Sequence, residues 1–275
     1  MKRLFCSDFD NTIARKGKIP KENVKAIHRL NDHGMEFVLV SGRPAGNIRY
    51  IFKKYGIRGH IIANNGALCL PGGEGPAQGH PIPPKEAMVL IDRAEREGWN
   101  YLFYSEEVCY FPTSWSRLLG SCIASGIVNL RTGMKVGSFS PRKPHFLEKG
   151  AFKMNIYVKK NLQGLIDEIN SAGGLSATQS GDDKAEVMAG GVNKLLGIRT
   201  LARTLQVPMD RVVAIGDFDN DAEMLEGAGW SFAMSDGSDR AIQAAKMTTD
   251  PVDRMGFVKA VDWIIANPEA GLLLA

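Results

Sequence analysis

The sequence contains few cysteines and no long apolar run. Its cysteines are Cys6, Cys69, Cys109 and Cys122, and no two of them have CxxC or zinc-site spacing. Cys6 and Cys69 lie within apolar segments, so we expect buried free thiols, as in a reducing compartment. No segment approaches the roughly 20 apolar residues of a membrane span, and no signal-length apolar stretch follows the basic start. We therefore expect a cytoplasmic protein without membrane contact.

The charge balance is close to neutral, with a formal net charge of +4 over 275 residues. Lys and Arg form no long run, so the sequence does not indicate a nucleic-acid surface. The small basic excess favours an anionic small ligand. The apolar fraction of 44% is ordinary for soluble proteins and sufficient for a real core in one large or two ordinary domains.

The two ends of the chain alternate apolar strands with amphipathic helices. Continuously apolar strands separated by helices predict a parallel sheet covered on both faces. The expected strands are 3–7, 36–41, 60–66, 211–217 and 230–235, of which 60–66 ends in turn residues. The expected helices are 20–34, 45–56, 194–208, 222–229 and 257–266.

The middle of the chain has a different pattern. The Gly- and Pro-rich segment 71–84 marks a boundary, after which most of the aromatic residues occur. Helices are expected at 85–97, 114–127 and 161–174, and strands at 99–105, 108–114 and 152–160. We expect an α/β core made of residues 1–81 and 185–275, with an inserted α+β domain at 82–184.

Polar residues follow the expected core strands where ligands bind to open parallel sheets. The first strand delivers Asp8 and Asp10, the second Ser41, Gly42 and Arg43, and the strand at 211–217 delivers Asp217, Asn220 and Asp221, while Lys194 opens a nearby helix. Clustered carboxylates are costly without a cation, and an all-oxygen ligand set suits Mg²⁺. Donors beside a metal are what a phosphate group requires.

Each of these residues also has an ordinary interpretation when taken alone. Asp and Asn residues cap helices and form turns, and a single lysine on a helix is usually solvated. Residues 217–221 also imitate the start of an EF-hand loop, but Ala222 and Ala228 stand where that loop requires Gly and Glu. The joint occurrence of four such segments favours a common site.

The four segments DFDNT (8–12), VSGRP (40–44), GVNK (191–194) and GDFDND (216–221) resemble the motifs of the haloacid dehalogenase superfamily. Their order and the insertion between the second and third resemble the Cof-type sugar-phosphatase subgroup, as do NNGA (64–67) and the closing DRMGFVKAV. The resemblance implies a Rossmann-like core with an inserted α/β cap that selects the substrate. Asn11, Leu195 and Phe218 depart from the usual motif residues without removing a reacting group.

The resemblance also implies roles for individual residues. Asp8 would attack phosphorus and form an aspartyl phosphate, and Asp10 would act as general acid and then general base. Mg²⁺ would be held by Asp8, Asp217 and the backbone carbonyl of Asp10, with Asp221 in support. Phosphate or substrate would be bound by Phe9, Ser41, Gly42, Arg43, Asn65, Lys194 and Asn220.

Three functions are compatible with this sequence. The first is a Mg²⁺-dependent phosphatase acting on small phosphorylated metabolites, with sugar phosphates as the expected class. A phosphomutase of similar architecture would return the phosphoryl group to the sugar. A non-catalytic phosphometabolite sensor would bind without turnover, although binding alone does not require the Asp8 and Asp10 pair.

Overall fold

The computed structural model describes residues 2–113 and 134–270 and divides the chain into two compact units. The first comprises residues 1–43, 51–78 and 193–275, and the second comprises 44–50 and 79–192. The expected fold class, an α/β core with an inserted α+β domain, is confirmed. The second unit continues eight residues past the expected limit at 184, because β11 (Lys184–Ala189) pairs with other strands of that unit.

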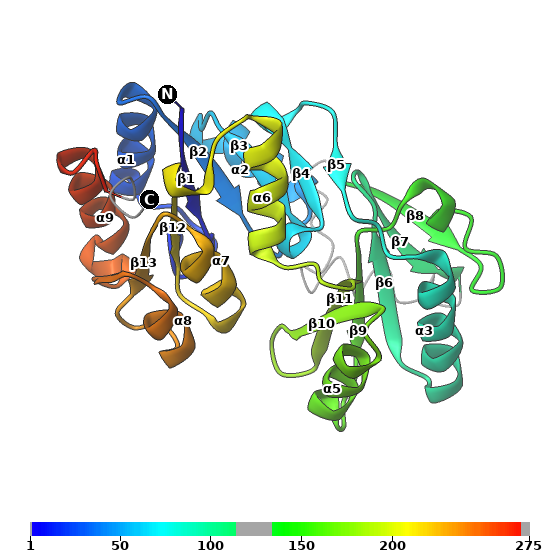
Figure 1. The fold of residues 1–275 in the computed structure, drawn as a ribbon. Coiled ribbons are helices and arrows are strands. Elements are labelled where there is room, and N and C mark those ends of the chain that lie inside the picture. Colours follow the sequence, from blue (N-terminus) through cyan, green and yellow to red (C-terminus); the bar gives the residue numbers. More distant parts are fainter. Residues whose placement is uncertain (1, 114–133, 271–275) are drawn as a thin grey trace. The chain divides into compact units, whose positions relative to one another are not determined.

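The first unit is built on an eight-stranded sheet (Figure 1). Its order is β14-β13-β12-β1-β2-β3-β4-β5, with parallel pairing from β14 to β3 and antiparallel pairing of β3 with β4. The strands are β1 Arg3–Ser7, β2 Met35–Val40, β3 His60–Ala63, β4 Leu68–Leu70, β5 Gln78–Gly79, β12 Val212–Gly216, β13 Trp230–Met234 and β14 Met247–Thr249. The nearly continuous apolar sequence of β1, β2 and β12 fits strands covered on both faces.

Helices cover both faces of this sheet because alternate strand residues point to opposite sides. Phe5 and Phe37 both make edge-on ring contacts with Phe257 of α9. Cys6 and Val38, one position further along each strand, pack in a cluster with residues of α6. The helices of this unit are α1 Lys21–Asp32, α6 Lys194–Thr204, α7 Ala222–Gly227, α8 Asp239–Ala244 and α9 Gly256–Ala266. The helix α2 Ala45–Tyr55 is divided between the two units after Tyr50.

The segment 60–66 forms a short strand that ends in turn residues, as the sequence predicts. The strand ends at Ala63, and Asn64–Gly66 form a short 3₁₀ turn, η1. Asn64 and Asn65 have φ angles of 52° and 55°, in the left-handed region that asparagine tolerates better than most residues. Consecutive left-handed residues cannot continue a strand, so the chain turns back there into β4.

The second unit contains a six-stranded sheet in the order β10-β11-β9-β6-β7-β8. All its pairings are antiparallel except that of β7 with β8. The elements are α3 Pro84–Glu97, β6 Asn100–Tyr104, β7 Val108–Pro112, β8 Lys135–Phe139, β9 Lys153–Tyr157, α5 Leu162–Ala172, β10 Leu175–Gln179 and β11. The helix expected at 114–127 lies outside the described residues, as does Cys122.

One face of the second sheet packs on α3 and α5, whose apolar residues join Tyr101, Phe103, Ile156 and Val187 in one cluster. The opposite face carries the buried ion pair of Lys153 and Glu186, with Nζ 3.1 Å from Oε1. The glutamate compensates the charge of the buried ammonium group, which is costly to leave unpaired. The second unit therefore has its own core.

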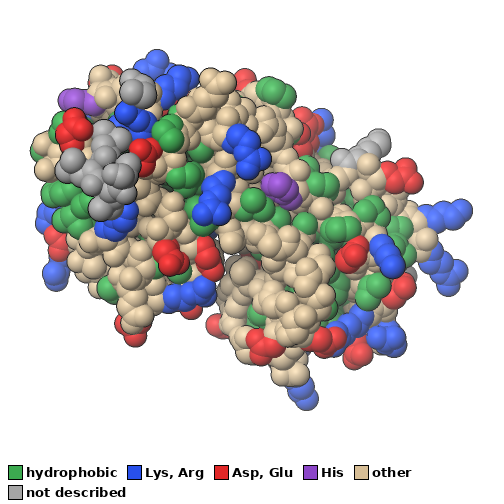
Figure 2. Space-filling model, in the orientation of Figure 1, with side chains coloured by type: hydrophobic (Ala, Val, Ile, Leu, Met, Phe, Trp, Pro, Cys, Tyr) green, Lys and Arg blue, Asp and Glu red, His purple; other side chains and the backbone are tan. Residues whose placement is uncertain are grey.

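Two further sequence predictions concern the cysteines and membrane-spanning helices. Cys6, Cys69 and Cys109 are buried. In the described part of the chain, no helix has both the length and the apolar character needed to cross a membrane. On the face shown in Figure 2, basic and acidic side chains are interspersed over the surface.

Candidate active site

Asp8 and Asp217 follow two neighbouring strands of the first unit. β1 and β12 are paired in parallel, with Ser7 opposite Ile215, and the Asp8 amide donates to the Ile215 carbonyl at 3.0 Å. Each aspartate is therefore the first residue beyond the end of a central strand. Both are largely buried, so the local sequence places two carboxylates at one edge of the sheet, where charge is poorly solvated.

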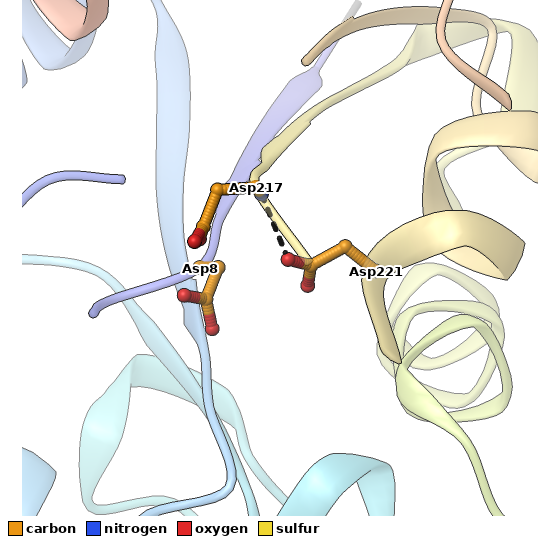
Figure 3. Close-up of side chains that lie close together, drawn as sticks. All are labelled: Asp8, Asp217 and Asp221. Carbon is orange, nitrogen blue, oxygen red and sulfur yellow. Dashed lines mark hydrogen bonds between the residues drawn. The ribbon is translucent and has the colours of Figure 1, made fainter. Parts of the chain in front are cut away.

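Asp221 joins them from the 3₁₀ turn η7 (Asp219–Asp221) that leads into α7. Its Oδ2 accepts hydrogen bonds from the backbone amides of Asp217 at 2.9 Å and Phe218 at 3.0 Å. Gly216 allows this approach, because a Cβ atom there would lie 2.6 Å from Asp221 Cβ. Figure 3 shows the three aspartates together and the hydrogen bond that joins Asp221 to Asp217.

Lys194 is the first residue of α6 and is almost completely buried. Its Nζ lies 2.6 Å from Asp8 Oδ1 and 2.5 Å from Asp221 Oδ1. Asn193 caps the helix by accepting the Leu196 amide at 2.8 Å, which fixes where the helix and its lysine begin. Although burial opposes it, the attraction of Asp221 and Asp8 raises the pKa of Lys194, so the ammonium form persists.

The single positive charge of Lys194 does not neutralise the negative charges of three ionised carboxylates. Burial, together with repulsion from Asp221 and Asp217, raises the pKa of Asp8 to about 8 despite the opposing pull of Lys194. Burial is also the main cause that raises the pKa of Asp217 to about 6, while the hydroxyl of Thr12, donating to Asp217 Oδ1 at 2.7 Å, lowers it. The site therefore has an affinity for additional positive charge.

The donor set fits a divalent cation. Asp8, Asp217 and Asp221 each offer a carboxylate oxygen, and these oxygens lie within 4.8 Å of one another. Hard oxygen ligands and a net negative charge are the preferred environment of Mg²⁺. Because Asp221 already accepts Lys194 and two amides, Asp8 and Asp217 are the carboxylates better placed to bind a cation directly.

The second predicted segment packs against the turn after β3. Ser41 is buried, its carbonyl accepts the Asn65 amide at 3.0 Å, and its hydroxyl accepts the Arg43 amide at 3.2 Å. The Asn64 amide donates to the Arg43 carbonyl at 3.1 Å. The left-handed turn at Asn64 and Asn65 thus fixes the backbone of residues 41–43 at the end of β2.

Asp10 is not part of the buried carboxylate group. Its side chain is about half exposed and forms a two-point ion pair with Arg43, with Nε 3.0 Å from Oδ2 and Nη2 2.7 Å from Oδ1. The ring of Phe9 is fully buried and lies beneath this guanidinium group, 4.5 Å from it. The sequence predicts that Phe9 and Arg43 bind phosphate or substrate. In the structure Arg43 pairs with Asp10, and the Phe9 ring packs against the Arg43 guanidinium group.

Asn11, between Asp10 and Thr12, has a φ of 59°. The usual glycine at this position is thus replaced by a residue that also tolerates the left-handed region. Asn220 is half-buried in η7, and the neighbouring Phe218 is one of the few exposed large apolar side chains among the described residues.

Sequence reasoning missed three residues that shape the site: Thr12, Asn193 and Gly216. All three lie inside segments already singled out, and Asn193 has the position of a helix N-cap. No sequence signal indicates that Gly216 must admit the Asp221 side chain, because that contact depends on the path of η7.

Comparison with known proteins agrees with this geometry. Residues 5–261 match the haloacid dehalogenase-like hydrolase family. Phosphatase YwpJ of Bacillus subtilis (strain 168) is 24% identical, over 92% of this chain and 96% of its own. The 5-amino-6-(5-phospho-D-ribitylamino)uracil phosphatase YitU of the same organism is 27% identical, over 93% and 95%.

A solved structure shares the fold. The subclass IIB sugar phosphatase BT4131 of this superfamily superimposes with a TM-score of 0.77 at 20% identity, covering 95% of this chain and 98% of its own. The expected enzyme class, a phosphatase of this superfamily, is confirmed. The chain thus belongs to the haloacid dehalogenase-like hydrolases of the Cof type.

Proposed function

We propose that this protein is a Mg²⁺-dependent phosphatase that hydrolyses small phosphorylated metabolites, with sugar phosphates as the substrate class, through an aspartyl phosphate on Asp8. The observation that carries the proposal is the convergence of Asp8, Asp217, Asp221 and Lys194 from three chain segments. The names of BT4131 and YitU, which refer to a sugar phosphatase and to a phosphorylated ribityl compound, support the substrate class.

The metal would be held by the carboxylates of Asp8 and Asp217 and the backbone carbonyl of Asp10. When bound, Mg²⁺ offsets the negative charge of the phosphoryl group and allows an anionic nucleophile to approach it. Asp221 holds this arrangement through its hydrogen bonds to Lys194 and to the amides of residues 217 and 218. Thr12 orients Asp217 from the other side.

In the first step an Asp8 carboxylate oxygen attacks phosphorus, and the bond from phosphorus to the leaving oxygen breaks. Asp10 gives its proton to that oxygen, which departs as an alcohol. In the second step Asp10 takes a proton from a water molecule, the resulting hydroxide attacks phosphorus, and the bond to Asp8 breaks. Inorganic phosphate leaves, and both aspartates return to their starting states.

Stabilisation of the transferring group falls to donors around the nucleophile. Lys194 carries a permanent positive charge 2.6 Å from Asp8, where the phosphoryl oxygens would lie once Asp8 attacks. Ser41, Gly42 and Asn220 complete the phosphate site, and Asn65 supports it from the turn after β3. We assign selection of the leaving group to the second unit, as the family resemblance implies.

The test is phosphate release from a panel of phosphorylated metabolites, measured with Mg²⁺ and again after chelation. Magnesium-dependent release of inorganic phosphate from sugar phosphates is the expected result. An isomeric sugar phosphate without free phosphate would identify a phosphomutase instead. Binding of sugar phosphates without either product, in the presence of Mg²⁺, would identify a sensor.

A further inference from the structure

Arg43 is joined to Asp10 in a geometry that restricts the carboxylate more than a simple charge contact would. Two nitrogens of the guanidinium group contact the two carboxylate oxygens, at 3.0 and 2.7 Å. Such fork-like pairing fixes the plane of the carboxylate as well as its distance. The pair is partly exposed, so it adds little to stability. The main effect of the pair is therefore the fixed orientation of the Asp10 carboxylate.

The arginine is itself held from three directions. Its guanidinium group lies over the buried ring of Phe9, 4.5 Å from the ring centre. Its amide donates to Ser41 Oγ at 3.2 Å, and its carbonyl accepts the Asn64 amide at 3.1 Å. Asn64 occupies the left-handed region, which costs free energy and is retained where surrounding contacts impose it. A residue so constrained is suited to hold another side chain in place.

We propose that Arg43 is a positioning residue that orients the Asp10 carboxylate for proton transfer to the leaving oxygen. This inference rests on the proposed function, and it differs from the phosphate-binding role that the sequence predicts for Arg43. Each carboxylate oxygen has two lone-pair directions, so an oxygen that accepts from Arg43 keeps one direction for the transferred proton. A defined orientation matters because proton transfer requires hydrogen-bond reach to the leaving oxygen.

The test compares two substrates whose leaving groups differ in their need for a proton. The p-nitrophenolate anion departs unprotonated, whereas the alkoxide of glucose 6-phosphate is strongly basic and requires the proton. The constant kcat/KM reports only the steps up to the first irreversible one, which here is departure of the leaving group. Hydrolysis of the aspartyl phosphate follows that step, so its rate does not affect kcat/KM. Arg43→Lys keeps the charge and removes the two-point geometry.

We expect Arg43→Lys to lower kcat/KM for the alkyl phosphate by roughly 10-fold or more, and for p-nitrophenyl phosphate by less than about 3-fold. Inhibition by inorganic phosphate should be unchanged, because the phosphate site is intact. Arg43→Met, which keeps an unbranched side chain without the guanidinium group, should show the same selectivity if the lysine variant does not fold. Arg29→Lys, whose guanidinium pairs with Asp262, is the matched control without effect on either substrate.

Three results would overturn the inference. Equal losses on both substrates, with weaker inhibition by phosphate, would show that Arg43 binds the phosphoryl group; unchanged rates on both would show that it has neither role. In an Asp10→Asn background, a further loss on adding Arg43→Lys would also contradict action through Asp10. Failure of the wild-type protein to hydrolyse either substrate with Mg²⁺ would instead refute the proposed function.

Discussion

Lys194 Nζ lies 2.6 Å from Asp8 Oδ1, although the two residues are 186 positions apart in the chain. Asp8 follows the central strand β1, and Lys194 opens a helix that begins after the whole second unit. The lysine places a positive charge beside the buried aspartate, and Asp8 and Asp217 each offer a carboxylate oxygen to a common space.

Asp8→Asn should abolish turnover while leaving the fold intact. An amide has nearly the shape of the carboxylate but is not a nucleophile, so phosphate release should fall by at least about 10³-fold. Thermal unfolding and circular dichroism would verify the fold. Turnover near the wild-type rate in a correctly folded variant would exclude the covalent mechanism.

Lys194→Ala should reduce both activity and stability. Removing a preorganised charge beside the nucleophile costs on the order of 10²-fold or more in kcat. It also leaves Asp8 and Asp221 buried without their ammonium partner, a loss of about 3–5 kcal/mol in the free energy of unfolding for a broken buried pair. Added Mg²⁺ should restore part of the stability but not the activity. Denaturant unfolding with and without Mg²⁺ tests this, and restored activity would contradict it.

Stabilisation by Mg²⁺ should depend on pH. The folded-state pKa values of Asp8, about 8, and Asp217, about 6, lie above the ordinary value of 3.8, so folding favours their protonated forms. The metal-free protein therefore loses stability as pH rises from about 4 to about 8. Because the metal binds the ionised forms, the rise in Tm on adding Mg²⁺ should be larger at pH 8 than at pH 6. A shift that is equal at both pH values would contradict this assignment.

Gly66→Ala should destabilise the protein far more than Gly72→Ala. Both glycines have positive φ angles, of 100° and 65°, so either substitution is strained. At Gly72 nothing lies within 4 Å of the new methyl group, and the cost should be about 1–2 kcal/mol. At Gly66 the methyl group would lie 2.0 Å from the Asn193 carbonyl oxygen, beside Lys194, and the loss should exceed about 3 kcal/mol. Similar midpoints of urea unfolding for the two variants would show that the turn can move away.

The sequence predicted the alternation of strands and helices because apolar periodicity is local. It also predicted which residues follow the strands, and the parallel sheet brings Asp8, Asp217 and Asp221 together. The partner of Asp10 could not be predicted, because Arg43 reaches it only through the path that Asn64 and Asn65 impose on the neighbouring turn. Likewise, the pairing of β11 that extends the second unit depends on contacts with β9 and β10 that no local pattern encodes.

The position of β1 between β2 and β12 has a consequence for biosynthesis. During translation β2 emerges soon after β1, but the other neighbour of β1 begins only at Val212, after the second unit has been made. One hydrogen-bonding edge of β1 must therefore wait, unpaired, for most of the synthesis, and a contact this distant in sequence forms slowly. The nascent chain thus carries an incomplete sheet edge, open to mispairing, until its last quarter leaves the ribosome.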